Sequence, residues 1–197
     1  MPFVIGLTGS IGMGKSTTSD MFREQGIPVW DADDAVNRLY SRGGEAVSAI
    51  RSEFPQAVID GVVCKDTLKN LIASDAKVLR RLENIVHPLV RRDREAFLAQ
   101  TPHPIVVLDI PLLFETGSAE DFDLVVVVSA PAETQKERVM ARPGMTEAQF
   151  ELINSKQMPD AQKRQSADMV ISTMDMDTAR DGVLKTLAMA KERTENA

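Results

Sequence analysis

Residues 6–17 read GLTGSIGMGKST, and this stretch constrains the fold more than any other part of the chain. Gly9-x-x-x-x-Gly14-Lys15-Ser16 has the spacing of a phosphate-binding loop, which connects a buried strand to a helix. The run from Phe3 to Thr8 is apolar, as such a strand requires, and a helical pattern follows Lys15. A glycine-rich turn with a chance lysine is the alternative, but the strand and helix context favours the phosphate-binding loop.

The residue types of this loop suit the binding of a nucleoside triphosphate. Glycines allow backbone N–H groups to turn toward phosphate oxygens, and the following helix presents its positive end. Lys15 is predicted to reach the β- and γ-phosphates, and the Ser16 hydroxyl to bind Mg²⁺. The predicted nucleotide-binding residues of the loop are Ile11, Gly12, Met13, Gly14, Lys15, Ser16 and Thr17.

Four further apolar runs predict the remaining strands of a sheet. They cover residues 28–30, 105–109, 124–128 and 169–172, and helical patterns separate them. The run at 124–128 is apolar throughout and the run at 105–109 is apolar up to Asp109, as strands covered on both faces should be. The chain is therefore predicted to be an α/β protein of the P-loop NTPase type, with a parallel sheet flanked by helices. The second strand is expected to lie beside the phosphate-loop strand.

Two segments interrupt this alternation. Residues 35–100 contain helical patterns and no convincing strand, with Pro88 expected to kink or break a helix. An irregular stretch begins at Arg142, and Thr146 to Gln149 has the spacing of a capping box. These patterns predict a core of residues 1–34, 101–141 and 156–197, a helical acceptor-binding insertion at 35–100 and a lid at 142–155.

The overall composition predicts a soluble cytoplasmic protein. The 197 residues are 43% hydrophobic and 26% charged, with one cysteine and two histidines. No run is long and apolar enough for a membrane span, and we expect no membrane partner. The net charge of −6 argues against a nucleic-acid partner. Too few histidines and cysteines are present for a metal site built from those residues.

Acidic residues follow two of the predicted strands. Asp109 ends an apolar strand, where a P-loop protein places an acid that acts on Mg²⁺, although a turn cap is the alternative. Asp31, Asp33 and Asp34 follow the second strand. One of them is expected to cap the next helix, and one to take part in catalysis.

Several arginines are candidates for phosphate contacts. Arg138 and Arg142 are four residues apart, so they are expected on one helix face ahead of the lid. Solvated surface arginines are the plain alternative for both. The insertion is locally basic, which suits an acceptor carrying a diphosphate, but a solvated face explains these residues equally well; they are Arg80, Arg81, Arg91, Arg92 and Arg94.

The sequence favours a small-molecule kinase over the other classes of P-loop protein. A GTPase switch requires an Asn-Lys-x-Asp tetrapeptide, which is missing, and a motor ATPase requires a larger chain with further motifs. A helical insertion and an arginine-bearing lid suit the binding of an acceptor and the exclusion of water. Within this class, a kinase of nucleoside monophosphates or of sugar acids is one alternative, and a nucleotide-gated binding protein is an alternative from another class.

The motifs together resemble the dephospho-coenzyme A kinase family from residue 5 to about residue 172. Beside the phosphate loop, the resemblance is carried by residues 31–33 (DAD), 87–88 (HP), 109–115 (DIPLLFE), 157–158 (QM), Lys163 and 167–168 (AD). It implies transfer of the γ-phosphoryl group of ATP to the ribose 3′-hydroxyl of dephospho-CoA, with Mg²⁺. It also implies a P-loop core, a helical acceptor-binding domain and a lid.

The candidate catalytic residues are Lys15, Asp33 and Arg142. Asp33 is predicted to be the base, with Asp31 as its rival, while Arg138 and Arg142 are predicted to contact the nucleotide. Ser16 and Asp109 are the predicted metal ligands. The sequence departs from the common family pattern at Ile153, where many members have arginine, and at Pro143, where a polar residue is common.

Overall fold

The computed structural model describes residues 2–195, and the chain divides into two units. The first, the sheet unit, comprises residues 1–29 and 101–197, and the second, the helical unit, comprises Trp30–Gln100. Each unit has its own buried apolar cluster. Within the described residues, no helix has the length and apolar character that a membrane crossing requires.

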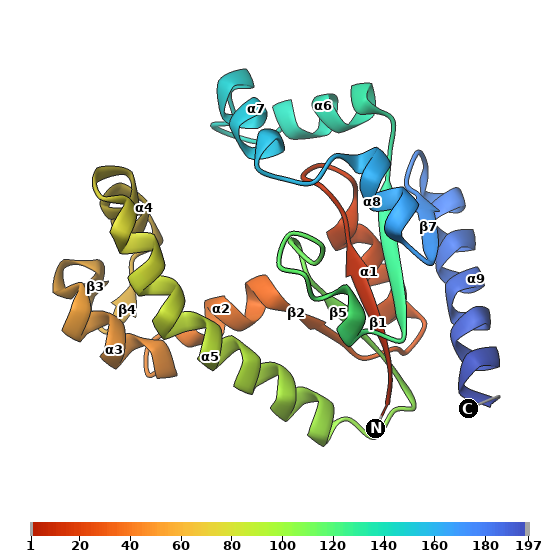
Figure 1. Ribbon diagram of the computed structural model, residues 1–197, viewed down its shortest axis with the longest axis horizontal. Coiled ribbons are helices and arrows are strands. Elements are labelled where there is room, and N and C mark those ends of the chain that lie inside the picture. Colours follow the sequence, from red (N-terminus) through yellow and green to blue (C-terminus); the bar gives the residue numbers. More distant parts are fainter. Residues whose placement is uncertain (1, 196–197) are drawn as a thin grey trace. The chain divides into compact units, whose positions relative to one another are not determined.

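A five-stranded sheet forms the centre of the sheet unit (Figure 1). Its order is β2-β5-β1-β6-β7, and the pairs β1–β5, β1–β6 and β6–β7 are parallel. The strands are β1 (Phe3–Thr8), β2 (Val29–Asp31), β5 (Ile105–Asp109), β6 (Leu124–Ser129) and β7 (Met169–Ser172). Every residue of β5 and β6 is buried, which explains why both strands are apolar up to their last residues, Asp109 and Ser129. The predicted α/β fold class is confirmed.

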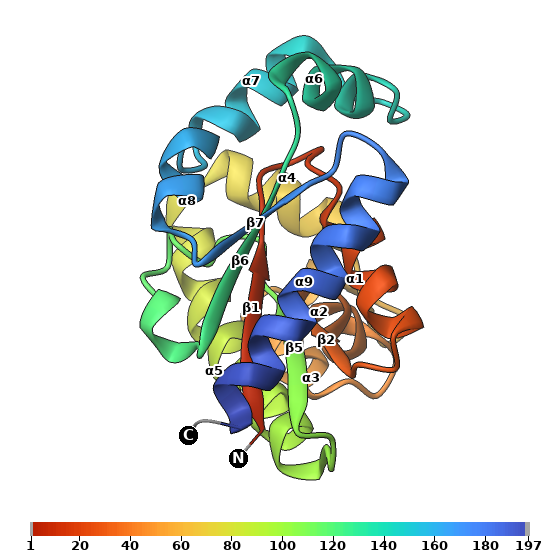
Figure 2. The same ribbon diagram turned by 90° about the vertical axis from the view of Figure 1, so that its right-hand side faces the viewer.

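Helices cover both faces of this sheet. Figure 2 shows α1 and α9 together on one face and α8 on the other. The helices of the unit are α1 (Lys15–Glu24), α6 (Ala132–Met140), α7 (Glu147–Ser155), α8 (Asp160–Ser166) and α9 (Met176–Glu195), with a short 3₁₀ turn η2 (Ala119–Asp121). Ile5, Leu7 and Phe22 are fully buried where α1 packs on the sheet. Because parallel strands all end at one edge, this packing brings the loops after β1, β5 and β6 to the same edge of the unit.

The helical unit forms a second core from short elements. These are α2 (Ala32–Tyr40), α3 (Glu45–Glu53), η1 (Pro55–Ala57), β3 (Val58–Ile59), β4 (Val62–Val63), α4 (Lys65–Ser74) and α5 (Ala76–Gln100). The side chains of Ala46, Ile50 and Ala57 are completely buried among them. Trp30 anchors the unit, since its indole N–H donates to Asp93 Oδ1 over 2.7 Å.

The structure corrects two local expectations for the helical unit. Pro88 does not break its helix, because the buried Val78, Leu82 and Val86 hold α5 against its neighbours, while a kink at Pro88 stays a prediction. A small antiparallel hairpin, β3–β4, is also present. Asp60 and Gly61 form its turn with φ values of 50° and 78°, the left-handed conformation that tight hairpins require.

The expected position of the second strand was also wrong. Strand β2 lies at the edge of the sheet, and β5 separates it from the phosphate-loop strand β1. Burial explains this order, because Val29 and Asp31 of β2 are only partly buried, whereas β5 has no exposed residue. Apolar runs predict strands well, but they carry little information about which strands are neighbours.

Candidate functional site

Residues 9–14 form a tight loop between β1 and α1, and the conformation of its glycines explains their presence. Gly12 and Gly14 have φ values of 78° and 86°, which disfavour residues with a Cβ atom. At Gly9, a Cβ atom would lie 2.4 Å from Val128 Cγ2, so the space is also too small. The predicted loop between strand and helix is therefore observed, with the backbone tightly turned at its end.

The N-terminus of α1 is suited to bind an anion. Gly14 is its N-cap, no side chain caps the first turn, and that turn contains no acidic residue. The first N–H groups of a helix have no partner within the helix, and the helix dipole adds positive potential at this end. Ser16 and Thr17 lie exposed in this turn. The loop and helix together can thus hold phosphate oxygens.

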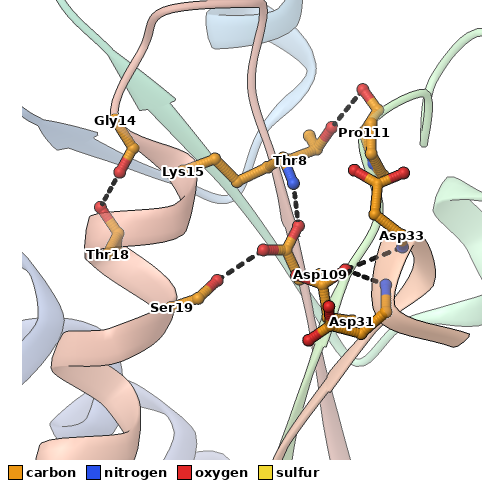
Figure 3. Close-up of polar contacts among 10 residues, drawn as sticks. Thr8, Gly14, Lys15, Thr18, Ser19, Asp31, Asp33, Asp109 and Pro111 are labelled. Atoms are coloured by element: carbon orange, nitrogen blue, oxygen red, sulfur yellow. Dashed lines mark hydrogen bonds and ion pairs between the residues drawn. The ribbon is translucent and has the colours of Figure 1, made fainter. Parts of the chain in front are cut away.

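Lys15 and Asp109 form an ion pair behind the loop (Figure 3). Asp109, at the end of β5, is completely buried, and the side chain of Lys15 is 15% exposed. Ser19 Oγ donates to Asp109 Oδ2 over 2.6 Å from the next turn of α1. The structure thus brings together two sequence candidates, Lys15 and Asp109, and identifies Ser19 as a partner that the sequence pattern did not indicate.

Arg138 is tied to the loop that follows β7. Its guanidinium donates to Thr173 O over 2.6 Å and to Thr173 Oγ1 over 3.3 Å. The Thr173 hydroxyl in turn donates to Met13 O of the phosphate loop over 2.8 Å. Thr173 therefore links the Arg138 side chain to the backbone of the phosphate loop through hydrogen bonds.

Arg142 and Arg138 do not lie on one helix face, so that expectation was wrong. Helix α6 ends at Met140, and exposed Arg142 lies in the turn beyond it. Pro143 lacks an N–H group and disfavours helical backbone in the residue before it, and Gly144 has φ 76°. The capping box is confirmed, because Thr146 Oγ1 accepts from Gln149 N–H and Gln149 Oε1 accepts from Thr146 N–H.

A buried ion pair stabilises the chain after α7. The side chain of Lys163 in α8 is completely buried, and its Nζ lies 2.9 Å from Glu115 Oε1. The same oxygen accepts from Met158 N–H over 2.8 Å. Burial alone would raise the pKa of Glu115, but the contacts with Lys163 and with the Met158 N–H lower it by more, so the net shift is downward. Glu115 therefore connects the loop after β5 to α8.

Within the helical unit, Asp31 and Asp33 have different environments. Asp31 is the N-cap of α2, and its Oδ1 accepts from the N–H groups of Asp33 and Asp34 over 2.8 and 3.0 Å (Figure 3). The expectation that one of these aspartates caps the helix is confirmed. The carboxylate of Asp33 is exposed and accepts no hydrogen bond from the residues that the structure describes. Asp33 is thus the more available of the two.

Several arginines of the helical unit are paired with acidic side chains. Arg81 contacts Glu53 at 2.9 Å and lies 5.1 Å from the centre of the Phe54 ring, and Arg92 contacts Glu45 at 3.4 Å. These pairs neutralise part of the basic character that the sequence indicates. Arg80 and Arg91 are exposed on α5.

Comparison with known proteins identifies relatives over nearly the whole chain. A family model described as dephospho-CoA kinase matches residues 3–177. A dephospho-CoA kinase of Ruegeria pomeroyi is 56% identical over 91% of both chains, and one of Cereibacter sphaeroides is 49% identical over 98% of both. A crystal structure of a Thermus thermophilus protein aligns with TM-score 0.85 and 36% identity, covering 95% of this chain and 97% of that one.

Proposed function

The chain belongs to the dephospho-CoA kinase family, whose reaction is the ATP-dependent phosphorylation of dephospho-CoA in CoA biosynthesis, and from this premise we propose which residues perform each step. Two observations at the phosphate loop carry the proposal together. No side chain caps the N-terminus of α1, and Lys15 at the end of the loop forms an ion pair with the buried Asp109. Residues 11–17 form the binding site for the triphosphate of ATP, and the backbone N–H groups of the first turn of α1 contact its oxygens. Lys15 stabilises the charge that spreads over the γ-phosphoryl group during transfer.

Ser16 and Asp109 are the residues that would hold Mg²⁺. The exposed hydroxyl of Ser16 lies in the first turn of α1 beside the proposed phosphate site, where it would bind the ion directly. Asp109 is completely buried and its oxygens are held by Lys15 and Ser19, so it would act on the ion through water. Such a site fits Mg²⁺, which is usually bound through one or two protein oxygens together with phosphate and water. When bound, the ion supplies positive charge that neutralises the phosphate oxygens.

Asp33 is proposed as the general base for the acceptor. The ribose 3′-hydroxyl of dephospho-CoA attacks the γ-phosphorus, a new O–P bond forms, and the bond to the bridging oxygen of ADP breaks. The hydroxyl proton passes to the Asp33 carboxylate as transfer proceeds. The availability of this carboxylate, compared with that of Asp31 at the helix cap, supports the assignment.

Residues 35–100 are proposed to bind dephospho-CoA, and residues 142–155 to act as a lid. Arg138 and Arg142 flank the start of the lid and are proposed to contact the nucleotide phosphates. Arginine suits this role because its planar guanidinium can donate two parallel hydrogen bonds to phosphate oxygens. A cytoplasmic location, with no nucleic acid or membrane as partner, remains a prediction from composition.

An ADP-release assay with a panel of acceptors tests the function. The purified chain is supplied with ATP, Mg²⁺ and either dephospho-CoA, adenosine monophosphate or gluconate. We expect rapid ADP release with dephospho-CoA only, and no release when Mg²⁺ is chelated. Comparable turnover with either other acceptor, and none with dephospho-CoA, would overturn the proposal.

A further inference from the structure

Two glutamine side chains hold both backbone polar groups of Ile11 in the phosphate loop. Gln135 Nε2 donates to Ile11 O over 2.8 Å, and Ile11 N–H donates to Gln157 Oε1 over 3.0 Å. The backbone of Ile11 is therefore held from two different parts of the chain.

The two glutamines lie on either side of the 142–155 segment. Gln135 is in α6, before the segment, and its residue is only 6% exposed. Gln157 follows α7, after the segment, and is partly buried. The neighbouring Met158 is fixed by its N–H bond to Glu115, which limits where the side chain of Gln157 can reach. The chain before the segment and the chain after it are therefore both bonded to one residue of the phosphate loop.

Fixing Ile11 also determines the path of the loop that follows. Gly12 has φ 78° and packs so closely on α6 that a Cβ atom would lie 2.5 Å from Val139 Cγ2 and 3.0 Å from Gln135 O. The directions of the next N–H groups depend on the backbone angles at Ile11 and Gly12. Preorganised donors bind phosphate without paying for reorganisation when the charge arrives.

We propose that Gln135 and Gln157 are positioning residues that hold the phosphate loop in its phosphate-binding conformation and bond it to both ends of the 142–155 segment. The proposal rests on the proposed use of this loop for ATP. A glutamine in this role acts through Ile11, so neither side chain needs to touch the nucleotide.

Methionine and glutamate variants at the two positions test the proposal. Gln135→Met and Gln157→Met keep the length of the side chain but remove the hydrogen bond. Each should lower kcat/KM for ATP about tenfold, the effect of one lost hydrogen bond to a partly buried backbone group, and leave KM for dephospho-CoA unchanged. Gln162→Met, the same change on an exposed face of α8, is the control and should retain wild-type values.

The glutamate variants separate the hydrogen bond from the added charge. Both place one negative charge beside Ile11, but a carboxylate at 157 still accepts from the Ile11 N–H, whereas a carboxylate at 135 cannot donate to Ile11 O. Gln157→Glu should therefore retain about tenfold more kcat/KM for ATP than Gln135→Glu. Thermal unfolding shows whether each variant at position 135 is folded. If one is not, the proposal is tested by comparing Gln157→Met with Gln157→Glu, and Gln157→Glu should have the higher kcat/KM for ATP.

A double variant completes the test. Because both bonds restrain the same residue, the loss in Gln135→Met with Gln157→Met should be close to that of the worse single variant. Methionine variants with wild-type ATP parameters, or equal activities of the two glutamate variants, would overturn the inference. If Lys15→Ala instead keeps wild-type kcat, the proposed use of the loop itself fails, so the two failures are distinguishable.

Discussion

Replacing Lys163 by methionine removes one charge of a buried ion pair and leaves the other without a partner. Lys163 is completely buried, and Glu115 is 16% exposed on its side-chain surface. Methionine fills much of the volume of the lysine stem but cannot pair with the carboxylate. Glu115 keeps the N–H of Met158 and its own backbone N–H, which are weaker partners than an ammonium group at 2.9 Å.

The expected destabilisation is large for a single substitution. Removing one member of a buried pair costs about 3–5 kcal/mol, because the remaining charge stays desolvated. In a domain of this size 1 kcal/mol shifts Tm by about 2–4 °C, so Tm should fall by about 6–20 °C. Combining Lys163→Met with Glu115→Gln removes both charges of this pair, so the double variant should be more stable than Lys163→Met alone.

The pH dependence follows from the direction of the Glu115 pKa shift. Contacts in the folded state lower this pKa despite burial, so the carboxylate contributes stability above its unfolded pKa. That contribution is lost as pH falls through the lowered pKa of the folded state. In Lys163→Met the effect of burial on the pKa of Glu115 is offset less, which favours the protonated carboxyl in the folded variant. The Tm difference between wild type and Lys163→Met should therefore be largest at the alkaline end of the pH range and decrease as the pH falls.

Thermal unfolding followed by circular dichroism between pH 3.5 and pH 8 measures both effects. Lys156→Met, which makes the same change at an exposed position, is the matched control and should leave Tm almost unchanged. The reasoning is refuted if Lys163→Met and Lys156→Met have the same Tm at pH 7. It is also refuted if the decrease in Tm of the double variant equals the sum of the decreases for Lys163→Met and Glu115→Gln.

Three further predictions concern catalysis. Lys15→Ala should lower kcat at least about 10²-fold, as loss of one charge contact to the transferring group does, and a near-native kcat in steady-state assays would contradict this. Backbone N–H groups of residues 142–155 should exchange hydrogen rapidly without nucleotide and slowly with ATP, as mass spectrometry can measure; equal protection in both states would exclude a lid. Asp33→Asn should lose most of its kcat, whereas Asp31→Asn should remain active.

The sequence predicted those parts of the fold where the residue pattern is compatible with few local structures. Residues 3–7 and 105–108 carry no polar side chain, and a strand in the interior of a sheet is the structure that requires this. The phosphate loop was predictable because the tight turn excludes side chains at Gly9, Gly12 and Gly14. The capping box at Thr146 was predictable because both of its hydrogen bonds are local.

Features that depend on tertiary packing were not predictable in this way. Pro88 continues a helix because apolar residues on the same helix are held by neighbouring elements, and nothing next to Pro88 in the sequence indicates this. The Asp60-Gly61 pair between two apolar dipeptides was a recognisable hairpin signal, but the strands are only two residues long. Gln135 resembles any polar helix residue until its burial against Ile11 is seen.

The comparison of Asp31 with Asp33 tests the proposed base most directly, because the same substitution removes one charge at each position. Asparagine is as good an N-cap as aspartate, so Asp31→Asn should keep the bonds from Asp33 N–H and Asp34 N–H and preserve α2. Asp33→Asn alters no hydrogen bond of its side chain to the described residues, so it should also fold, but an amide cannot take the hydroxyl proton. General-base catalysis contributes about 10²–10⁴-fold, and kcat of Asp33→Asn should fall by that factor with ATP affinity retained in titration. If Asp31→Asn is inactive and Asp33→Asn turns over normally, the base is Asp31, and its capping bonds must be exchanged for contact with the acceptor.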